Sequence, residues 1–416
     1  MEGKEKGALI TPRRQSQHAG LITIIATMSL FGPLAINMSL PGIVQTGQDL
    51  GTTTAAIQAT MAAFMLGFAA GQLVWGALAD RWGRRFPVLL GLSIFLVSSV
   101  VCALAQSQEL LFAARLMQGF GSCAGIVLAR AIVSDNFAGK EAAVIFSWQH
   151  LIMGIAPVIA PLLGGALLLI SSWRSIFWTL AGLVAATIPF LIAKLPESQS
   201  REAAEHAQSE GRIAAYMALI GNRPLLAHVL TSGLSASALM VWYSAASPLF
   251  QEDFGWTSRT TSIVIGALGI TLISATQINR RLLNHFTPRQ IIEAALLGGI
   301  TVLVAGLLLT LTHVPGAKIF ATISVVLGGS TYRMLSANNQ ACALALDRRR
   351  AGSVGALIGA SNYGIGAVFA WLVSQLPSAH GITMLTMMAA LFIAARLVLG
   401  LLNPHGSLSH QAEQQS

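Results

Sequence analysis

Charged residues are scarce in this sequence. Aspartate, glutamate, lysine and arginine make up only 10% of its 416 residues, whereas hydrophobic residues make up 54%. A soluble domain typically has about 25% charged residues, so a chain this apolar would precipitate in water unless lipid covered its surface. The scarcity of charge therefore excludes an ordinary soluble protein and predicts an all-α polytopic membrane protein in a lipid bilayer.

Cysteine is rare as well. Its three copies, Cys102, Cys123 and Cys342, stand singly in apolar segments, and no C-x-x-C spacing occurs. This excludes a cysteine-rich metal site, and isolated thiols suit small core positions. The sequence also contains no H-E-x-x-H, no G-x-S-x-G and no phosphate-binding loop, so the motifs of several enzyme classes are missing. We therefore expect no metal, no other cofactor and no enzyme activity.

Acidic residues are missing from the middle of every long apolar run. Asp49, Glu109, Glu252 and Asp253 fall in predicted outer loops, and Glu293 falls at the end of a run. The remaining acids lie in loops or tails on the other side. A carrier that exchanges protons needs a group that titrates inside the membrane, and the usual carboxylate is not available here.

Long apolar runs with short polar connections predict twelve membrane spans, because about 20 apolar residues cross a bilayer as a helix. These spans lie at residues 19–40, 55–79, 86–105, 110–131, 141–169, 174–194, 224–250, 258–279, 290–312, 317–341, 352–376 and 380–402. The chain then divides into a tail at 1–18, a six-helix half at 19–194, a linker at 195–223, a second six-helix half at 224–402 and a tail at 403–416.

The net charge of +9 does not indicate a nucleic-acid partner, because the basic residues are unevenly distributed. Of the 25 Lys and Arg, only Arg174, Arg259 and Lys318 fall in predicted outer loops. Arg115, Arg333 and Arg396 fall inside spans. The remaining lysines and arginines lie in the tails and loops on the opposite side of the membrane. Basic residues gather in cytoplasmic loops. We therefore expect both termini and the linker in the cytoplasm, without a nucleic-acid partner.

A short loop between spans 55–79 and 86–105 reads Gly76-Ala-Leu-Ala-Asp80-Arg81-Trp-Gly83-Arg84-Arg85. A cytoplasmic bias explains the arginines but not the acid or the glycines. The pattern G-x-x-x-D-R-x-G-R-R resembles motif A of the major facilitator superfamily of transporters. The resemblance implies a conformational switch, in which Asp80 meets the helix that begins near Gly352 and holds an outward-open state. The predicted switch residues are Gly76, Asp80, Arg81, Gly83, Arg84, Arg85 and Arg130.

Two further patterns resemble motifs of the same superfamily. In span 141–169, Gly154, Pro157, Pro161, Gly164 and Gly165 are similar to motif C, which antiporter branches carry. Prolines bend such a helix and glycines let a neighbour approach, so a merely kinked helix is the alternative. In span 110–131, Arg115 and Gln118 resemble motif B, whose arginine is linked in the family to coupling of protons and substrate. Snorkelling of Arg115 to the membrane surface is the alternative.

The first span ends Pro33-Leu-Ala-Ile-Asn37-Met-Ser-Leu-Pro41. With Leu50-Gly-Thr-Thr-Thr54 and the run from Phe64 to Leu73, it resembles the Bcr/CflA branch of the drug:proton antiporters over nearly the whole chain. The resemblance implies the twelve-helix major facilitator fold, with two six-helix halves that rock around a midplane cavity.

One residue departs from that branch. The branch has an aspartate where this sequence has Asn37, and an amide cannot carry a proton. Coupling has therefore moved to another group or been lost. His150 and His228 could titrate near neutral pH, although each is equally readable as a packed histidine.

The arginines inside spans suggest a preference for solute charge. We hypothesise that Arg115 and Arg333 face one cavity that favours anionic or zwitterionic solutes, because an intramembrane arginine needs a polar partner. The alternative is that Arg333 only stabilises the contact between the halves. Aromatic, thioether and amide side chains are weaker candidates for cavity lining: Met38, Met153, Trp242, Tyr243, Tyr332 and Asn338.

Together these patterns predict an inner-membrane efflux transporter for drugs or other small molecules. We expect alternating access, protons as the counter-ion and a monomer. The alternative is an exporter with narrow specificity for an anionic or zwitterionic metabolite or siderophore, with atypical or absent proton coupling.

Overall fold

The computed structural model describes residues 12–137, 139–195, 197, 212–312, 316–376 and 380–403. Within this part of the chain there is no strand, and twelve helices are 20 residues or longer, which confirms the all-α prediction. Eleven helical segments are long and apolar enough to cross a membrane. The twelve helices are α1 (Pro12–Ser39), α3 (Thr54–Trp82), α4 (Arg85–Leu104), α5 (Gln108–Asn136), α6 (Gly139–Ile170), α7 (Arg174–Lys194), α10 (Arg223–Pro248), α11 (Ser258–Leu282), α12 (Pro288–Leu311), α13 (Ala317–Leu346), α14 (Ala351–Gln375) and α15 (His380–Leu402).

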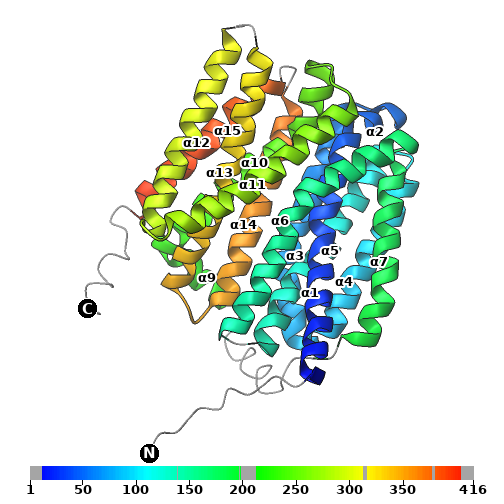
Figure 1. The fold of residues 1–416 in the computed structure, drawn as a ribbon, viewed down its shortest axis with the longest axis vertical. Coiled ribbons are helices and arrows are strands. Elements are labelled where there is room, and N and C mark those ends of the chain that lie inside the picture. The colour runs from blue at the N-terminus through cyan, green and yellow to red at the C-terminus, as the bar shows by residue number, and fades with distance from the viewer. Residues whose placement is uncertain are drawn as a thin grey trace, which may run out of the picture.

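Figure 1 shows two groups of helices side by side, α1–α7 in blue to green and α10–α15 in green to red. We call them the first half and the second half. α3 packs against α14, and α6 packs against α11, so these four helices form most of the interface between the halves. The end of the bundle with the Asp80–Arg85 loop is called the arginine-rich end, and the end with Asp49 and Arg174 is called the far end.

The first span is longer than predicted. α1 already begins at Pro12, and after Ser39 the chain continues as a 3-10 turn, Leu40–Gly42 (η1), and a short helix, Ile43–Asp49 (α2). Pro41 explains the break, because proline has no backbone N–H to give to the preceding turn. A single apolar segment therefore reaches from Thr23 to Asp49.

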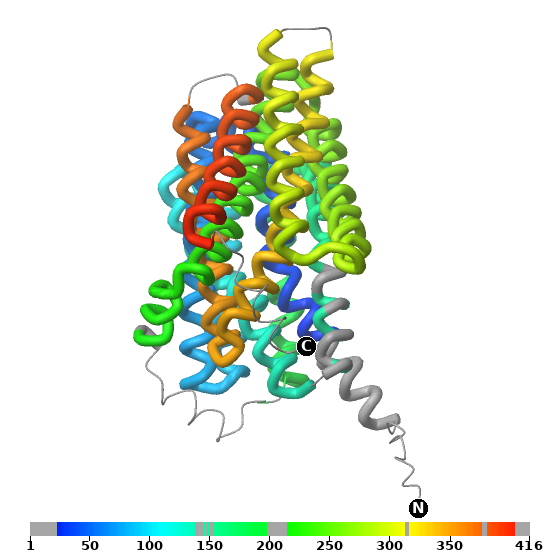
Figure 2. Tube along the Cα trace, turned by 90° about the vertical axis from the view of Figure 1, so that its left-hand side faces the viewer, coloured from blue at the N-terminus to red at the C-terminus, as the bar shows by residue number. Residues whose placement is uncertain are grey.

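The predicted linker contains a helix of its own. Arg212–Gly221 (α9) packs on α10 and α14, where Leu219 is buried against Leu225 and Val354. Figure 2 shows α9 beside the lower end of α14. Residues 198–211 of the linker lie outside the described residues. Helix α13 reaches Leu346, five residues beyond the end of the predicted span. Because it contains many polar residues, it is not one of the eleven helices that are apolar enough to cross a membrane.

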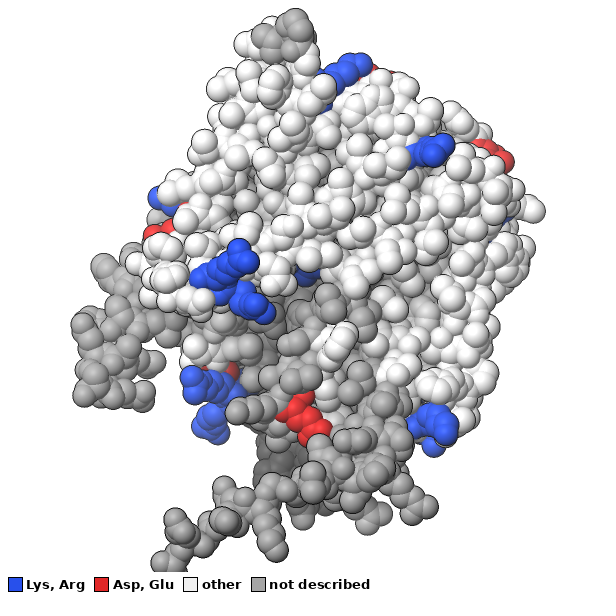
Figure 3. Space-filling view, viewed as in Figure 1, with Lys and Arg blue, Asp and Glu red and all other residues white. Residues whose placement is uncertain are grey.

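Small residues let helices of the first half approach closely. A methyl group on Gly67 would lie 1.9 Å from the backbone oxygen of Leu116, and one on Gly119 would lie 1.9 Å from that of Phe64. α3 and α5 therefore pack backbone to backbone, as small residues allow in membrane bundles. Outward-facing residues are apolar, for example Val97, Ile170 and Leu401. Figure 3 shows few charged side chains, with large uncharged areas between them.

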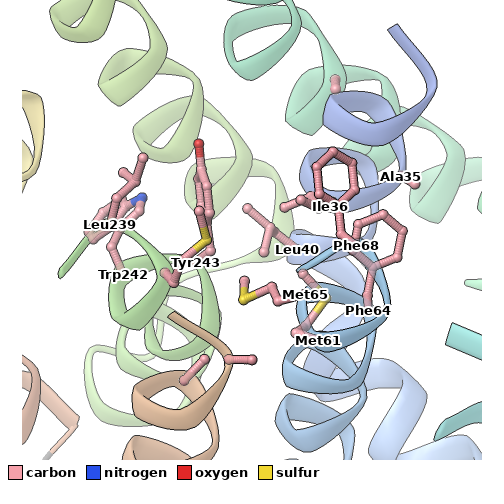
Figure 4. Packing of buried hydrophobic residues seen from close by; sticks show 14 of the residues in the cluster. Ala35, Ile36, Leu40, Met61, Phe64, Met65, Phe68, Leu239, Trp242 and Tyr243 are labelled. Carbon is pink, nitrogen blue, oxygen red and sulfur yellow. The ribbon is translucent and has the colours of Figure 1, made fainter. Parts of the chain in front are cut away.

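Large side chains fill the space between the halves toward the far end. Leu40 of η1 and Met65 of α3 point toward Tyr243 of α10, and all three are buried (Figure 4). The hydrophobic core is therefore continuous across the interface at this level.

Candidate functional site

Arg84 is the centre of the loop at the arginine-rich end. Its guanidinium forms ion pairs with Asp80 at 2.6 Å and with Asp135 at 2.8 Å, and its side chain is only 10% exposed. Asp80 ends α3 and Asp135 ends α5, so one arginine joins the ends of two helices. The motif thus forms a compact cluster of charges that a change in helix position would disturb.

Gly83 has a structural reason to be glycine. Its φ of +79° lies in the left-handed region, and a methyl group would lie 2.4 Å from a carboxylate oxygen of Glu197. Glu197 accepts hydrogen bonds from the backbone N–H groups of Arg84 at 2.7 Å and Arg85 at 3.2 Å. Arg85 also donates to the backbone oxygen of Ile192 at 2.5 Å. The loop is therefore tied to the end of α7.

Sequence reasoning missed Glu197 and Asp135. For Asp135 the signal was present, because this acid stands at the cytoplasmic end of a predicted span, on the same side as the arginines. Among the predicted switch residues, Arg81 is exposed and Gly76 is partly buried on α3.

Two predicted partners of Asp80 lie elsewhere in this structure. A methyl group on Gly352, at the start of α14, would meet nothing within 4 Å. Arg130 is not part of the Asp80–Arg84–Asp135 cluster. Its electrostatic neighbours are Cys123 on its own helix and Tyr363 and Tyr332 of the second half. The predicted contact of Asp80 with the start of α14 is therefore not seen in this structure.

The far end is closed by contacts between the halves. Gln58 of α3 donates to the backbone oxygen of Ser244 at 2.9 Å, and Thr54 donates to Glu252 at 2.5 Å. Gln251 donates to the backbone oxygen of Pro41 at 3.0 Å. Glu252 and Gln251 both lie in Leu249–Asp253 (η2), a short π-helix. π-helical turns often occur at functional positions.

The glycines of the predicted motif C face two different neighbours. A methyl group on Gly164 would lie 2.1 Å from the backbone oxygen of Met38 in the first half. One on Gly165 would lie 2.2 Å from Oγ of Ser262 on α11 in the second half. Pro157 also contacts α11, at Gly269, and Pro161 is the second proline inside α6, whereas a methyl group on Gly154 would meet only Ile273, at 3.6 Å. The close contact of α6 with α11 therefore depends on Gly165 and on Gly269.

The halves separate toward the arginine-rich end. At Gly359 of α14 a methyl group would lie 2.5 Å from the side chain of Gln72 on α3. Gly355 lies one turn closer to the arginine-rich end, and a methyl group there would have no neighbour within 4 Å. The same is true of Gly352. The interface is thus tight at the far end and in the middle, and open at the arginine-rich end.

Arg115 is enclosed within the first half. It is 1% exposed and donates to Gln118 Oε1 at 2.7 Å and to the backbone oxygen of Ala35 at 3.2 Å. Its other contacts are Ser39 Oγ at 3.3 Å and Met61 Sδ at 2.9 Å. The rings of Phe64 and Phe177 lie 4.6 and 5.6 Å from its guanidinium carbon. The alternative of a snorkelling side chain is therefore wrong for this structure.

The hypothesis that Arg115 and Arg333 face one cavity is also not supported by this packing. The electrostatic neighbours of Arg333 are Tyr243 and Tyr363. Arg130 interacts with Tyr332 and Tyr363, so it is Arg130 that shares surroundings with Arg333. Both arginines are only partly buried, and the Tyr363 ring is tilted against the Phe68 ring across the interface, with centroids 4.2 Å apart. We call Arg130, Tyr243, Tyr332, Arg333 and Tyr363 the tyrosine–arginine cluster.

Asn37 lies next to this cluster rather than next to Arg115. Its Nδ2 donates to the backbone oxygen of Pro33 at 2.8 Å, and its side chain is within interaction range of the Tyr243 hydroxyl. Ala35 and Ser39, which contact Arg115, are two residues away on either side. Residues two apart on a helix point in nearly opposite directions, so position 37 faces the second half.

Several predicted lining residues are packed in the interior. Met38 and Trp242 are buried, and the rings of Trp242 and Phe250 meet edge to face with centroids 5.7 Å apart. Asn338 is buried and donates to Asn279 Oδ1 at 2.6 Å. Met153 is partly buried. Tyr243 is buried as well. In this state, Met153 and the partly buried Tyr332 remain among the predicted lining residues.

The two histidines have different outcomes. His228 is buried between two amides, with Nδ1 2.9 Å from Asn339 Oδ1 and Nε2 3.4 Å from Asn403 Nδ2. Asn339 is oriented by its own bond to the backbone oxygen of Leu335, so Nδ1 donates and Nε2 accepts, which suits a neutral ring. His150 lies on α6, but its side chain is outside the described residues. Within the described part of the chain, no three His, Cys, Asp or Glu side chains gather into a metal site.

Comparison with known proteins agrees with this architecture. A family model described as Major Facilitator Superfamily matches residues 20–371. An uncharacterized MFS-type transporter, YdgK, of Bacillus subtilis is 30% identical over 96% of this chain and 98% of its own length. The bicyclomycin resistance protein homolog of Haemophilus influenzae is 26% identical, with 90% and 94% covered. The crystal structure of a D-xylose-proton symporter superposes with a TM-score of 0.75 at 14% identity, covering 93% and 98%, and shares the fold.

Proposed function

The chain belongs to the major facilitator superfamily, and on this premise we propose that it is an efflux transporter that exports small, drug-like molecules by alternating access. Its similarity to a bicyclomycin resistance protein homolog supports the direction and the class of solute. A multi-pass membrane position follows from the family and from the apolar spans.

The observation that carries this proposal is the asymmetry of the interface. The far end is closed by Gln58–Ser244 and Thr54–Glu252, while Gly352 and Gly355 at the arginine-rich end face open space. Basic loops lie on the cytoplasmic side, so the open end is assigned to the cytoplasm. This inward-open state is the one in which an exporter loads its solute. Rocking of the halves would then close the arginine-rich end and open the far end.

The same assignment fixes the remaining parts of the proposal. Both termini and α9 lie in the cytoplasm, and the membrane is the bacterial inner membrane. We assign a monomer, because each chain contains both halves that enclose the cavity. Protons are the proposed counter-ion. Their carrier is then not residue 37, and His150 is a better candidate than His228, whose two ring nitrogens already have partners.

A second candidate is favoured by the tyrosine–arginine cluster. Arg130 and Arg333 have no ion pair with a carboxylate among the described residues, and three tyrosines surround them. Cationic side chains in a membrane interior attract anions strongly, because little water competes. An exporter of an anionic or zwitterionic metabolite or siderophore would use this cluster to hold a carboxylate.

Everted membrane vesicles test both candidates. A pH gradient is formed, acid inside, and solutes are added while the gradient is followed with a fluorescent dye. Discharge by chloramphenicol supports a drug:proton antiporter, whereas discharge only by carboxylate-bearing solutes supports the second candidate. Vesicles that hold the Asp80→Asn variant are the matched control. Radiolabelled solute that moves without proton release overturns proton coupling. If neither chloramphenicol nor the carboxylate-bearing solutes move, the proposal of an exporter is overturned.

A further inference from the structure

A small cavity lies beside Arg115, apart from the interface between the halves. Its walls come from the ends of α1, η1, α2, α3, α5 and α7, and they include Ser39, Thr46, Thr60 and Trp173. The cavity volume is about 20 Å³. About 10–15 Å³ is needed to hold one water molecule, so this cavity has room for one particle of that size.

The charge of Arg115 is not neutralised by a carboxylate in the described part of the chain. Its hydrogen-bond acceptors are an amide oxygen, a backbone oxygen, a hydroxyl and a thioether, all of them neutral. One terminal nitrogen, Nη2, has only the Ser39 hydroxyl at 3.3 Å and the thioether of Met61, a weak acceptor, as partners. Burying a charge without an opposite charge is expensive. The site is therefore electrostatically incomplete.

The groups around the cavity do not supply the missing charge. Asp49 is near Trp173, but it accepts from Trp173 Nε1 at 3.0 Å and forms an ion pair with Arg174. Cys102 interacts with Arg115 electrostatically, but a thiol in apolar surroundings is normally neutral. Position 37 points to the second half, so even an aspartate there would face away from this cavity.

We propose that this cavity binds one small monovalent inorganic anion of the chloride class, held by Arg115. The guanidinium supplies the charge, and the hydroxyl groups of Ser39 and Thr60, which now donate to helix carbonyls, can rotate to donate to the anion. A volume of about 20 Å³ favours an ion of this size over sulfate, phosphate and organic carboxylates, which are larger. The site lies outside the tyrosine–arginine cluster, so it is independent of the proposed solute.

The anion has a structural consequence. Arg115 bridges α5 to α1 through Ala35 and Ser39, and the cavity lies against the break at η1. An anion at this position neutralises the bridge and stabilises the contact of α1 with α5. Protein stability should then depend on chloride itself and not only on ionic strength.

Bromide gives the direct test. Crystals of the native chain soaked in sodium bromide should show an anomalous peak in contact with the Arg115 guanidinium. In parallel, thermal unfolding of the purified protein is followed in sodium chloride and in sodium gluconate at equal ionic strength. The expected result is an unfolding temperature several degrees higher in chloride, with saturation, because a ligand bound only to the folded state stabilises it.

Two variants and one control complete the experiment. Arg115→Gln should lose the chloride-specific shift, and Thr60→Met, which fills the cavity while keeping the arginine, should lose it as well. Arg396→Gln changes an exposed arginine of the second half and should keep it. Equal unfolding temperatures in the two salts, water alone at the site in bromide, or a full chloride shift in Thr60→Met would each overturn the proposal.

Discussion

Gln58 of α3 donates a hydrogen bond of 2.9 Å to the backbone oxygen of Ser244 on α10, and both residues are buried. In a helix that oxygen would accept from the residue four positions later. This residue is Pro248, which has no N–H group. The amide of one half therefore satisfies a carbonyl that a proline of the other half leaves without a partner. The closed far end depends on this relationship.

Replacing Gln58 should open the far end. Gln58→Met leaves the Ser244 oxygen buried without a donor in the closed state, which costs about 1–3 kcal/mol, whereas water reaches it in the open state. We expect the population of the far-end-open state to rise by roughly fivefold or more. Distances between spin labels at the exposed positions Gln106 and Gln375 measure that population.

A double-mutant cycle separates this effect from a general loss of stability. Pro248→Ala restores an N–H group to the helix, so Gln58→Met should have a smaller effect in that background. Gln149→Met removes a similar buried amide bond, to Ser29 at 2.7 Å, inside the first half, and should not change the label distance. Equal effects in both backgrounds would disprove the role of Pro248.

Two adjacent glycines should respond differently to the same substitution. Gly164→Ala places a methyl group 2.1 Å from the Met38 backbone within one half, so the fold itself must shift, at a cost of about 1–3 kcal/mol. Gly165→Ala places one 2.9 Å from Cβ of Ser262 in the other half. We expect the first to lower the unfolding temperature and the second mainly to widen the far end.

The matched control for both glycines is Gly154→Ala, where a methyl group meets only Ile273 at 3.6 Å, an ordinary contact. Thermal unfolding and spin-label distances are measured for all three variants. If Gly165→Ala lowers stability as much as Gly164→Ala without any change in label distance, the contact of α6 with α11 is not state-dependent.

The loop at the arginine-rich end should be needed for movement rather than for binding. Asp80→Asn removes one of the two carboxylates that hold the largely buried Arg84, and breaking such a pair strongly destabilises the arrangement. We expect transport to fall at least tenfold while the solute still binds. Glu293→Gln breaks an ion pair of 2.8 Å that is more exposed and should cost less than twofold. Transport by Asp80→Asn at the rate of the native chain would refute the switch.

Much of the fold could be predicted from the sequence because lipid leaves few options. An apolar run must be a helix, and span 174–194 coincides with α7. The differences lie at the ends of the helices. α1 begins at Pro12 rather than at residue 19, and α13 begins at Ala317 as predicted but reaches Leu346.

The site was harder to predict, because the type of a residue does not show which neighbouring helix its side chain faces. Arg115 and Arg130 stand on the same helix, yet one is enclosed in the first half and the other is near tyrosines of the second. Their spacing alone could not decide which of them accompanies Arg333. Glu197 was missed because its partners are backbone N–H groups, which have no signature in the sequence.

His228 should matter for stability and not for coupling. Its ring bridges Asn339 and Asn403, which lie on α13 and directly after α15. His228→Gln cannot span both amides in the same geometry, so we expect a lower unfolding temperature with an unchanged pH profile of transport. His150→Gln is the comparison, and a shifted pH profile is expected there if His150 carries the proton. A shifted profile in His228→Gln would contradict the packed role.

Arg333 should select for negative charge on the solute. A hydrogen bond to a charged group contributes about 1.5–3 kcal/mol, so Arg333→Gln should raise the half-saturation concentration for a carboxylate solute by roughly tenfold or more. A neutral solute of similar size should change by less than twofold. Arg396→Gln, an exposed arginine of the same half, is the matched control and should leave both values unchanged. Equal losses for charged and neutral solutes would show that Arg333 holds the halves together instead, because a purely structural role cannot distinguish the charge of the cargo.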